Sequence, residues 1–391
     1  MTVHASQTTL TIPTAAPPAT AATRVGFVSG VLEGTGGLEL FELAAAGGLA
    51  RRGWDVVCVY DKPGDLLGRW SATASVHHGA EDALRDVDVL YVHDTYRLPA
   101  ALEIGHRIGR PVVSHLHLPP FHRRPGVLGR IAGRQRYSVG EALGSRTTVD
   151  RFIAVSHRTR QMWIDVGLPA DRIDVVHNGV DIHRFRPAAA GERKAVRERL
   201  GIDDDVFVVG YIGRLEREKG LSQLFRAFRA VREATGRPMR LLMVGGPSRR
   251  ETGGIGAAKE AYLTELHRTA PRHSTWMGRR RDVDELMRGM DLVVVPSQWE
   301  EPFGLVAAEA LASGVPVLGT RRGGLTEVLG GSLADNLVGT SWRSIARGMR
   351  RHLDEPSRGP RLGAEGRRTV EAQFDVAQTV QGIERVLRSV S

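Results

Sequence analysis

The sequence PSQWEEPFGLVAAE occupies residues 296–309. It follows the apolar run Leu292–Val295, which is typical of a buried parallel strand, and it leads into an apolar helix that stops at Ser313 and Gly314. A strand, a loop and a helix start form the place where open α/β sheets bind ligands. Free N–H groups and the positive end of the helix dipole suit a phosphate there. The stretch therefore predicts a doubly wound α/β domain with a ligand site at this helix.

Two carboxylates flank the helix start. Glu301 lies in the loop and Glu309 lies on the second turn of the helix, with seven residues between them. An ionised carboxylate accepts hydrogen bonds from both hydroxyls of a vicinal diol, so the pair could hold sugar hydroxyls on either side of a diphosphate. The alternative is that Glu301 caps the helix and Glu309 is a surface residue. Two glutamates at a fixed spacing favour this alternative when taken alone. The flanking residues, Pro296-Ser297 before Glu301 and Phe303-Gly-Leu305 after it, reverse that preference and favour the sugar-binding interpretation.

A second motif follows another predicted strand, Val206–Gly213. It reads Arg214-Leu-Glu-Arg-Glu-Lys219-Gly220. Two fixed cations at this position would offset the negative charge of a phosphate-bearing ligand. Solvated charges at a helix start are the alternative. The position after a buried strand, with glycine on both sides, favours the cation pair.

A similar sequence of strand, loop and helix is predicted near the N-terminus. The predicted strand Arg24–Ser29 enters a Gly-rich loop with Gly34, Gly36 and Gly37, and a helix follows. These glycines lack the G-x-G-x-x-G spacing of dinucleotide-binding loops, so NAD is a weak interpretation. Gly36 and Gly37 would allow close approach of the backbone to a ligand, and a turn that needs positive φ is an equal alternative.

The motifs Gly-Arg-x4-Lys-Gly and E-x7-E resemble those of retaining glycosyltransferases of family 4, which have the GT-B fold. The resemblance implies two Rossmann-like doubly wound domains that face each other across a cleft. It implies that Arg214 and Lys219 clamp the donor diphosphate. Glu301 would then contact the transferred sugar and Glu309 the nucleotide ribose. His117, at the end of a predicted strand, would contact a sugar hydroxyl or the acceptor, although a lone histidine is as often structural.

Further donor contacts follow from the same resemblance. They are the loop residues Gly36 and Gly37, with Gly246, Arg279, Phe303, Gly304 and Leu305. The family's route is front-side attack, in which a donor phosphate oxygen takes the acceptor's proton. No metal and no cofactor are expected, and UDP-GlcNAc or UDP-glucose is the expected donor. The acceptor is expected to be a small soluble molecule.

The predicted organisation has four parts and a returning helix. Residues 1–23 form a disordered tail, 24–185 the N-terminal acceptor domain, 186–204 a linker, and 205–369 the nucleotide-sugar domain. Residues 370–391 are expected to return as a helix to the N-terminal domain. The repetition is architectural, because no residue-level repeat is present.

Composition narrows the function classes. The 391 residues carry a net charge of +10, and such a charge makes nucleic acid or an anionic membrane a candidate partner. Aromatic residues that could stack on bases do not interleave the basic stretch 104–140, and that stretch lacks the apolar content of interfacial helices. A solvated or acceptor-side surface is therefore favoured. The single Cys58 excludes an internal disulfide and fits a cytoplasmic location.

The expected function is retaining transfer of a hexose or N-acetylhexosamine from a UDP-sugar to a small hydroxyl-bearing acceptor, in aminocyclitol-type natural-product or glycan biosynthesis. A membrane-associated transferase with a lipid-linked acceptor is one alternative. A phosphorylase or epimerase of the same fold is another.

Overall fold

The computed structural model describes residues 23–34, 37–93, 97–120, 149–247 and 256–391. The strands of the N-terminal half are β1 (Arg24–Val31), β2 (Asp55–Lys62), β3 (Ser75–His78), β4 (Val89–Val92), β5 (Val112–Leu116), β6 (Arg151–Ala154) and β7 (Ile173–Val175). Those of the C-terminal half are β8 (Phe207–Ile212), β9 (Met239–Val244), β10 (Ser274–Gly278), β11 (Leu292–Val295), β12 (Val317–Thr320) and β13 (Leu337–Val338).

Helices connect the strands. They are α1 (Gly37–Arg51), α2 (Leu67–Ser71), α3 (Leu98–Ile108), α5 (His157–Ile164), α6 (Glu192–Arg199), α7 (Leu221–Thr235), α8 (Ala257–Thr269), α9 (Val283–Arg288), α10 (Leu305–Ala312), α11 (Leu325–Val328), α12 (Trp342–Asp354), α13 (Arg358–Gln373) and α14 (Val376–Arg388). Short 3-10 helices are η1 (Glu81–Leu84), η3 (Ala170–Arg172), η4 (Arg217–Lys219) and η5 (Gly331–Asn336).

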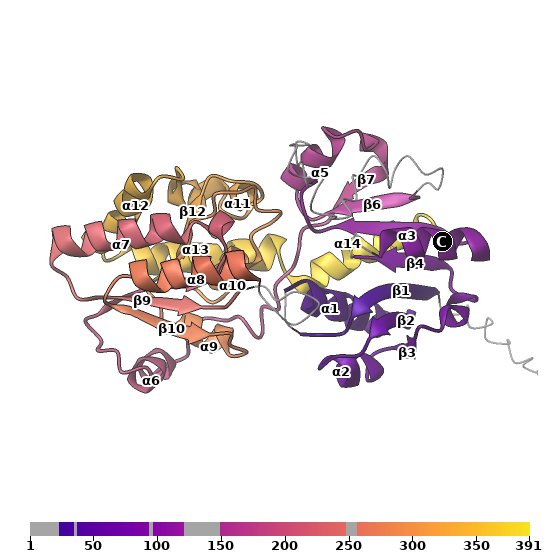
Figure 1. Cartoon of the computed structure of the whole chain (residues 1–391), viewed down its shortest axis with the longest axis horizontal. Helices are drawn as coiled ribbons and strands as arrows, with labels where there is room; N and C mark the ends of the chain where they lie inside the picture. The colour runs from indigo at the N-terminus through magenta and orange to yellow at the C-terminus, as the bar shows by residue number, and fades with distance from the viewer. Residues whose placement is uncertain (1–22, 35–36, 94–96, 121–148, 248–255) are drawn as a thin grey trace, which may run out of the picture.

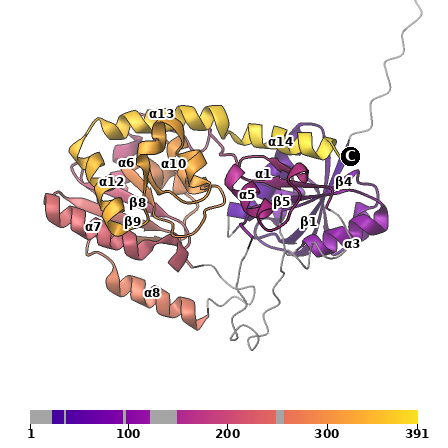
Figure 2. The same ribbon diagram turned by 90° about the horizontal axis from the view of Figure 1, so that it is seen from above.

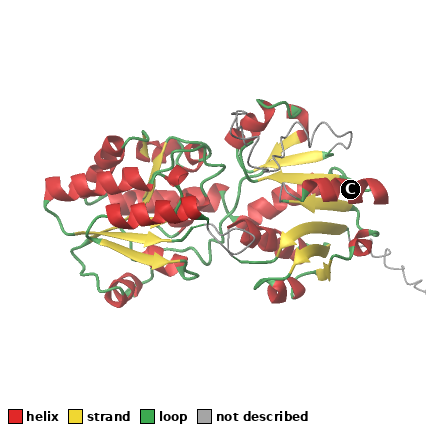
Figure 3. Ribbon diagram, viewed as in Figure 1, coloured by secondary structure: helices red, strands yellow, loops and turns green. Residues whose placement is uncertain are grey.

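The strands form two separate parallel sheets, one in each half of the chain (Figures 1 and 3). Within the described residues the N-terminal sheet has the order β3-β2-β1-β4-β5-β6-β7, and the C-terminal sheet has the order β10-β9-β8-β11-β12-β13. The central strand β4 is buried along its whole length, which explains its unbroken apolar sequence VLYV. The predicted class, two Rossmann-like doubly wound domains, is confirmed.

The order of the strands predicts one ligand-binding position in each sheet. The order reverses between β1 and β4 in the first sheet and between β8 and β11 in the second. Ligands of open α/β sheets bind at the carboxyl ends of the strands that flank such a reversal. The loops that follow these four strands carry most of the residues singled out from the sequence.

The last two helices connect the domains. Figure 2 shows α13 lying along the C-terminal domain and α14 along the N-terminal domain. Helix α14 packs on α1, where a Cβ atom on Gly48 would lie 2.3 Å from Val380 Cγ2, so that glycine allows the close packing. Trp54 Nε1 donates to Glu384 Oε1 at 3.2 Å in the same contact.

The segment 186–204, expected to link the domains, contains helix α6. Arg197 of this helix is only 2% exposed. Its guanidinium donates to Asp291 Oδ2 at 2.6 Å and also to the carbonyls of Gly289 and Val206. The helix thereby packs against the C-terminal domain.

Two sequence-based expectations fall outside the described residues: the tail, in 1–22, and most of the basic stretch, in 121–148. Among the helices that the structure describes, none is long and apolar enough to cross a bilayer.

Candidate active site

Glu301 lies at the centre of the loop between β11 and α10. It is 7% exposed, and its Oε1 atom lies 2.6 Å from Lys219 Nζ. Ser297 Oγ and Trp299 Nε1 also donate to this oxygen, the latter at 3.1 Å. Lys219 Nζ lies 5.0 Å from the centroid of the Trp299 ring, which adds a cation–π contact. The two sequence motifs therefore meet in one buried ion pair.

Arg214 directly follows the β8 strand and its turn. Its Nη1 atom lies 2.6 Å from Glu216 Oε2, and its carbonyl accepts a hydrogen bond from Tyr211 Oη at 2.6 Å. The Arg214 side chain remains half exposed, whereas Lys219 is largely buried. One cation is thus held at the surface of the site and the other within it.

Glycines hold the Glu301 loop by direct backbone contact. Gly323 has φ +57°, and a Cβ atom there would lie 2.0 Å from the Glu301 carbonyl oxygen. The N–H of Gly324 donates to that carbonyl at 2.7 Å. On the other side, a Cβ atom on Gly220 would lie 1.9 Å from the Pro296 carbonyl oxygen. Any larger side chain at Gly220 or Gly323 would displace the loop.

Glu309 lies half-buried on α10, and no hydrogen bond to its carboxyl group is found within the described residues. Burial raises the pKa of Glu309 to about 8; the nearby Arg184 lowers it and Asp284 raises it further. A carboxyl group with this pKa is largely protonated at neutral pH. Hydrogen bonds from a diol would favour its ionised form.

The start of α10 carries the other residues expected to bind the donor. The Phe303 side chain packs inward, with its ring centroid 5.3 Å from that of Phe374, so only its backbone is available to a ligand. Gly304, with φ +105°, makes the turn into the helix. Leu305 faces the other domain: a Cβ atom on Gly37 would lie 3.5 Å from Leu305 Cδ2. Gly36 lies outside the described residues.

Gly246 and Arg279 follow the neighbouring strands β9 and β10. A Cβ atom on Gly246 would lie 3.2 Å from Arg279 Cγ, and the Arg279 guanidinium donates to the Pro247 carbonyl. The structure therefore brings these two residues together at the same sheet edge as Arg214, whose neighbour Leu215 donates its N–H to the Gly246 carbonyl.

His117 comes from the N-terminal domain, just after β5. Its ring lies 4.1 Å from that of His115 and 4.7 Å from that of Phe41, measured between centroids. Burial lowers the pKa of His117 well below its ordinary value, and His115 and His93 lower it further. The imidazole is therefore neutral, so one of its ring nitrogens can accept a hydrogen bond.

An interdomain contact that sequence reasoning missed lies beside the Glu301 loop. Glu327 of α11 accepts hydrogen bonds from the backbone N–H groups of His157 and Arg158, both at 2.9 Å. It thus caps α5 of the other domain. Ser156 Oγ, in the same turn, donates to the Pro302 carbonyl at 2.5 Å.

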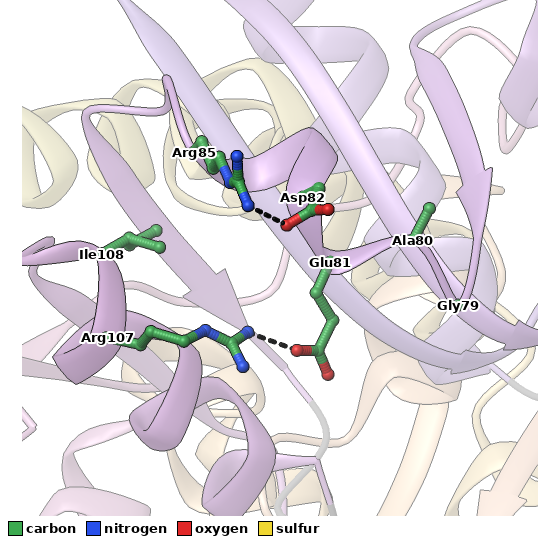
Figure 4. Close-up of a pocket in the computed structure, with 7 residues that line it drawn as sticks. All are labelled: Gly79, Ala80, Glu81, Asp82, Arg85, Arg107 and Ile108. Carbon is green, nitrogen blue, oxygen red and sulfur yellow. Dashed lines mark hydrogen bonds and ion pairs between the residues drawn. The ribbon is translucent and has the colours of Figure 1, made fainter.

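Two other features lie apart from these residues. His157, His177 and Glu327 have ligand atoms within 4.8 Å of one another, the one such group in the described residues, but a cation there would oppose the α5 dipole that Glu327 already compensates. A surface pocket lies between η1 and α3, where Arg107 pairs with Glu81 and Arg85 with Asp82 (Figure 4). None of the candidate site residues lines it.

The two parallel-sheet domains have the GT-B fold, and cations and carboxylates lie at the carboxyl ends of the strands of the second sheet. The chain belongs to glycosyltransferase family 4. A family model described as "Glycosyl transferases group 1" matches residues 192–369, and one described as "Glycosyltransferase Family 4" matches residues 35–184.

Similar proteins support this membership. A D-inositol 3-phosphate glycosyltransferase of Kineococcus radiotolerans is 31% identical over 353 residues, 84% of this chain and 77% of that protein. The enzyme of the same name from Rhodococcus erythropolis is 34% identical over 223 residues, 56% of this chain and 48% of that protein. The chain thus spans about half the length of this relative.

Solved structures agree in fold. Anabaena Alr3699/HepE in complex with UDP-glucose superposes with a TM-score of 0.77 at 21% identity, covering 93% of this chain and 99% of that one. WaaG, a glycosyltransferase involved in lipopolysaccharide biosynthesis, superposes with a TM-score of 0.72 at 17% identity, covering 94% and 99%.

Proposed function

We propose that the protein transfers a hexose or N-acetylhexosamine from a UDP-sugar to a small polyhydroxylated acceptor, with retention of anomeric configuration. The observation that carries this proposal is the meeting of Lys219 and Glu301 at 2.6 Å, at the carboxyl ends of β8 and β11. A cation for a diphosphate and a carboxylate for sugar hydroxyls lie side by side there.

In this proposal the diphosphate lies between Arg214 and Lys219 and the start of α10. Negative charge develops on the leaving group during transfer, and fixed cations and helix N–H groups stabilise it. Lys219 is held in place by Glu301 and Trp299, so little reorganisation accompanies the reaction. Glu301 then has one oxygen turned to Lys219, which leaves the other for a sugar hydroxyl.

Glu309 is assigned to the ribose diol. Its half-buried carboxyl group lies about one helical turn beyond the start of α10, the end that is proposed to bind the diphosphate. Two hydroxyl donors would satisfy both of its oxygens, and they would shift it toward the ionised form.

The acceptor is proposed to be a cyclitol or a cyclitol phosphate. The support is the set of relatives named D-inositol 3-phosphate glycosyltransferase, and the small-acceptor expectation from the sequence. D-inositol 3-phosphate is therefore the first acceptor to test, with myo-inositol as the unphosphorylated comparison.

The test pairs a panel of UDP-sugars with these acceptors and detects products by mass spectrometry. Transfer from one UDP-sugar, with an α-linked product by NMR from an α-linked donor, supports the proposal. A sugar 1-phosphate formed from inorganic phosphate would instead indicate a phosphorylase, and a rearranged UDP-sugar without acceptor would indicate an epimerase. Absence of any UDP-sugar turnover would contradict both the transferase and the epimerase.

A further inference from the structure

Glu300 directly precedes Glu301 and joins three parts of the chain. Its Oε2 atom accepts a hydrogen bond from Arg158 Nε at 3.1 Å, and Arg158 belongs to helix α5 of the N-terminal domain. The same oxygen accepts from the N–H of Gly323 at 3.0 Å, and Oε1 accepts from Arg322 Nη1 at 3.3 Å. Arg322 and Gly323 lie in the turn after β12. One carboxylate therefore links the loop after β11, the turn after β12 and a helix of the other domain.

The Glu300 carboxyl group is held in its charged form. Burial disfavours that form, but hydrogen bonds from Arg158 and Arg322 and from a backbone N–H outweigh it, so the pKa of Glu300 is lowered. Hydrogen bonds to an ionised acceptor are stronger than those to a neutral one. The Glu300 side chain is 29% exposed and that of Arg158 is 43% exposed, so water and salt weaken their ion pair in part.

The first turn of α5 also holds the chain on the other side of Glu301. The Pro302 carbonyl accepts hydrogen bonds from Ser156 Oγ and from Thr159 Oγ1, the latter at 2.9 Å. Both hydroxyl-bearing residues are fully buried, so water does not compete for these contacts. The residues before and after Glu301 are thus both bound to one helix of the N-terminal domain.

The segment 300–302 determines where the Glu301 carboxylate lies. The Glu301 carbonyl accepts from the N–H of Gly324 at 2.7 Å, and Oε1 of the side chain lies 2.6 Å from Lys219 Nζ. A change in the path of the main chain would move the second carboxylate oxygen, which is proposed to accept a sugar hydroxyl. A misplacement of about 1 Å in a substrate-positioning group can cost about a hundredfold in rate.

We propose that Glu300 and Arg158 are positioning residues that hold the Glu301 loop in the orientation that binds the transferred sugar of the donor. The N-terminal domain thereby contributes to recognition of the donor sugar through α5. This inference rests on the proposed function, because it concerns the same donor site. Its effect falls on the sugar and not on UDP, since Arg214 and Glu309, which are proposed to bind UDP, lie outside the segment that α5 holds.

Three substitutions test this role. Glu300→Gln keeps the shape of the side chain and one oxygen acceptor but removes the charge. Arg158→Met removes the guanidinium and keeps an unbranched side chain on α5. Arg160→Met is the matched control, because Arg160 lies on the same helix but donates only within its own domain, to the carbonyls of Ile173 at 3.0 Å and Ala170 at 2.7 Å.

Each variant is titrated by calorimetry with UDP and with UDP-glucose or UDP-GlcNAc, whichever the wild type binds. Glu300→Gln is expected to weaken binding of the UDP-sugar by about tenfold, because three donors lose a charged acceptor. Arg158→Met is expected to weaken it by about threefold, as for a single partly exposed ion pair. Binding of UDP should stay unchanged in both variants, and Arg160→Met should bind both ligands as the wild type does.

A second readout asks whether Glu300 acts through Glu301. In protein that carries Glu301→Ala, the further substitution Glu300→Gln should cause no additional loss of UDP-sugar binding, because the residue that it positions is already gone. Binding of UDP by the doubly substituted protein shows that the donor domain is still folded.

Equal weakening of UDP and UDP-sugar binding by Glu300→Gln would overturn the inference, since it indicates a general effect on the fold. Unchanged UDP-sugar binding in Glu300→Gln and Arg158→Met would do so too, as would an additive loss in the Glu301→Ala background. If Glu300→Gln does not fold, the partly exposed Arg158 decides the matter through Arg158→Met. If the wild type binds no UDP-sugar, the proposed function fails and this inference fails with it. A wild type that binds the donor beside variants without a selective loss would overturn this inference alone.

Discussion

Lys219 Nζ lies 2.6 Å from Glu301 Oε1, although the two residues are 82 positions apart in the chain. Lys219 ends the 3-10 helix after β8, and Glu301 lies in the loop after β11. Because β8 and β11 are neighbours at the reversal of strand order, their following loops must meet. This single contact joins the two motifs that identify the family.

Lys219→Met should reduce the rate of sugar transfer by roughly a hundredfold, because one of the charges that stabilises the leaving diphosphate is lost. It should also destabilise the fold by about 1–3 kcal/mol, since buried Glu301 loses its cationic partner. Lys219→Arg, which keeps the charge, is the control. Equal activity of the Met variant and the wild type would contradict this role.

Binding of a UDP-sugar should strengthen as pH rises from about 6 to about 8 and then level off. The pKa of Glu309 is raised to about 8 in the free protein, and ribose hydroxyls favour its ionised form. Binding at neutral pH must therefore release a proton. Calorimetry in buffers of different ionisation enthalpy measures that release. Glu309→Gln should bind more weakly, with no such pH dependence; a wild-type affinity that is flat over this range would contradict the assignment.

Gly323→Ala should abolish or strongly weaken UDP-sugar binding, because its Cβ atom would lie 2.0 Å from the Glu301 carbonyl oxygen. Gly331→Ala is a matched control. Both glycines have φ +57°, but a Cβ atom on Gly331 meets nothing within 4 Å. The control should cost only about 1–2 kcal/mol of backbone strain and leave binding intact. Similar binding by the two variants would show that the Glu301 loop tolerates displacement.

Glu327→Gln should lower the melting temperature by a few degrees at neutral pH, because α5 loses the charge that caps it. Burial disfavours ionisation of Glu327, but hydrogen bonds from His177 and from the N–H groups of Arg158 and His157 outweigh it, so its pKa is lowered. A lowered pKa means that the stabilisation is present above the unfolded-state value near 4.5 and is lost as pH falls. The difference between variant and wild type should therefore shrink in acid. A constant difference would contradict this origin.

The sequence was sufficient for the fold, and it placed the loops that carry Lys219 and Glu301 next to each other, where the two side chains form an ion pair. Both loops follow buried strands, β8 and β11, so strand order determines where they lie. Phe303 shows the limit of this reasoning: it lies between the two glutamates, yet its side chain is buried in the core against Phe374. Motif spacing carries no information about side-chain direction.

Contacts between the two domains could not be predicted from the sequence either. Glu327 and the N–H group of His157 are 170 positions apart, and they meet only because two separately folded domains pack together. Glu300 gave no signal either, since it falls outside the seven-residue spacing of the two glutamates. Its contact with Arg158 joins residues that are 142 positions apart.

The most direct test of the central claim is titration calorimetry of UDP-glucose and UDP-GlcNAc against the wild type, Lys219→Met and Glu309→Gln. The account predicts that at least one of these donors binds the wild type, and that each substitution weakens its binding by about tenfold or more. Binding that is unchanged in both variants, or no binding of either donor to the wild type, would contradict the placement of the donor between β8, β11 and α10.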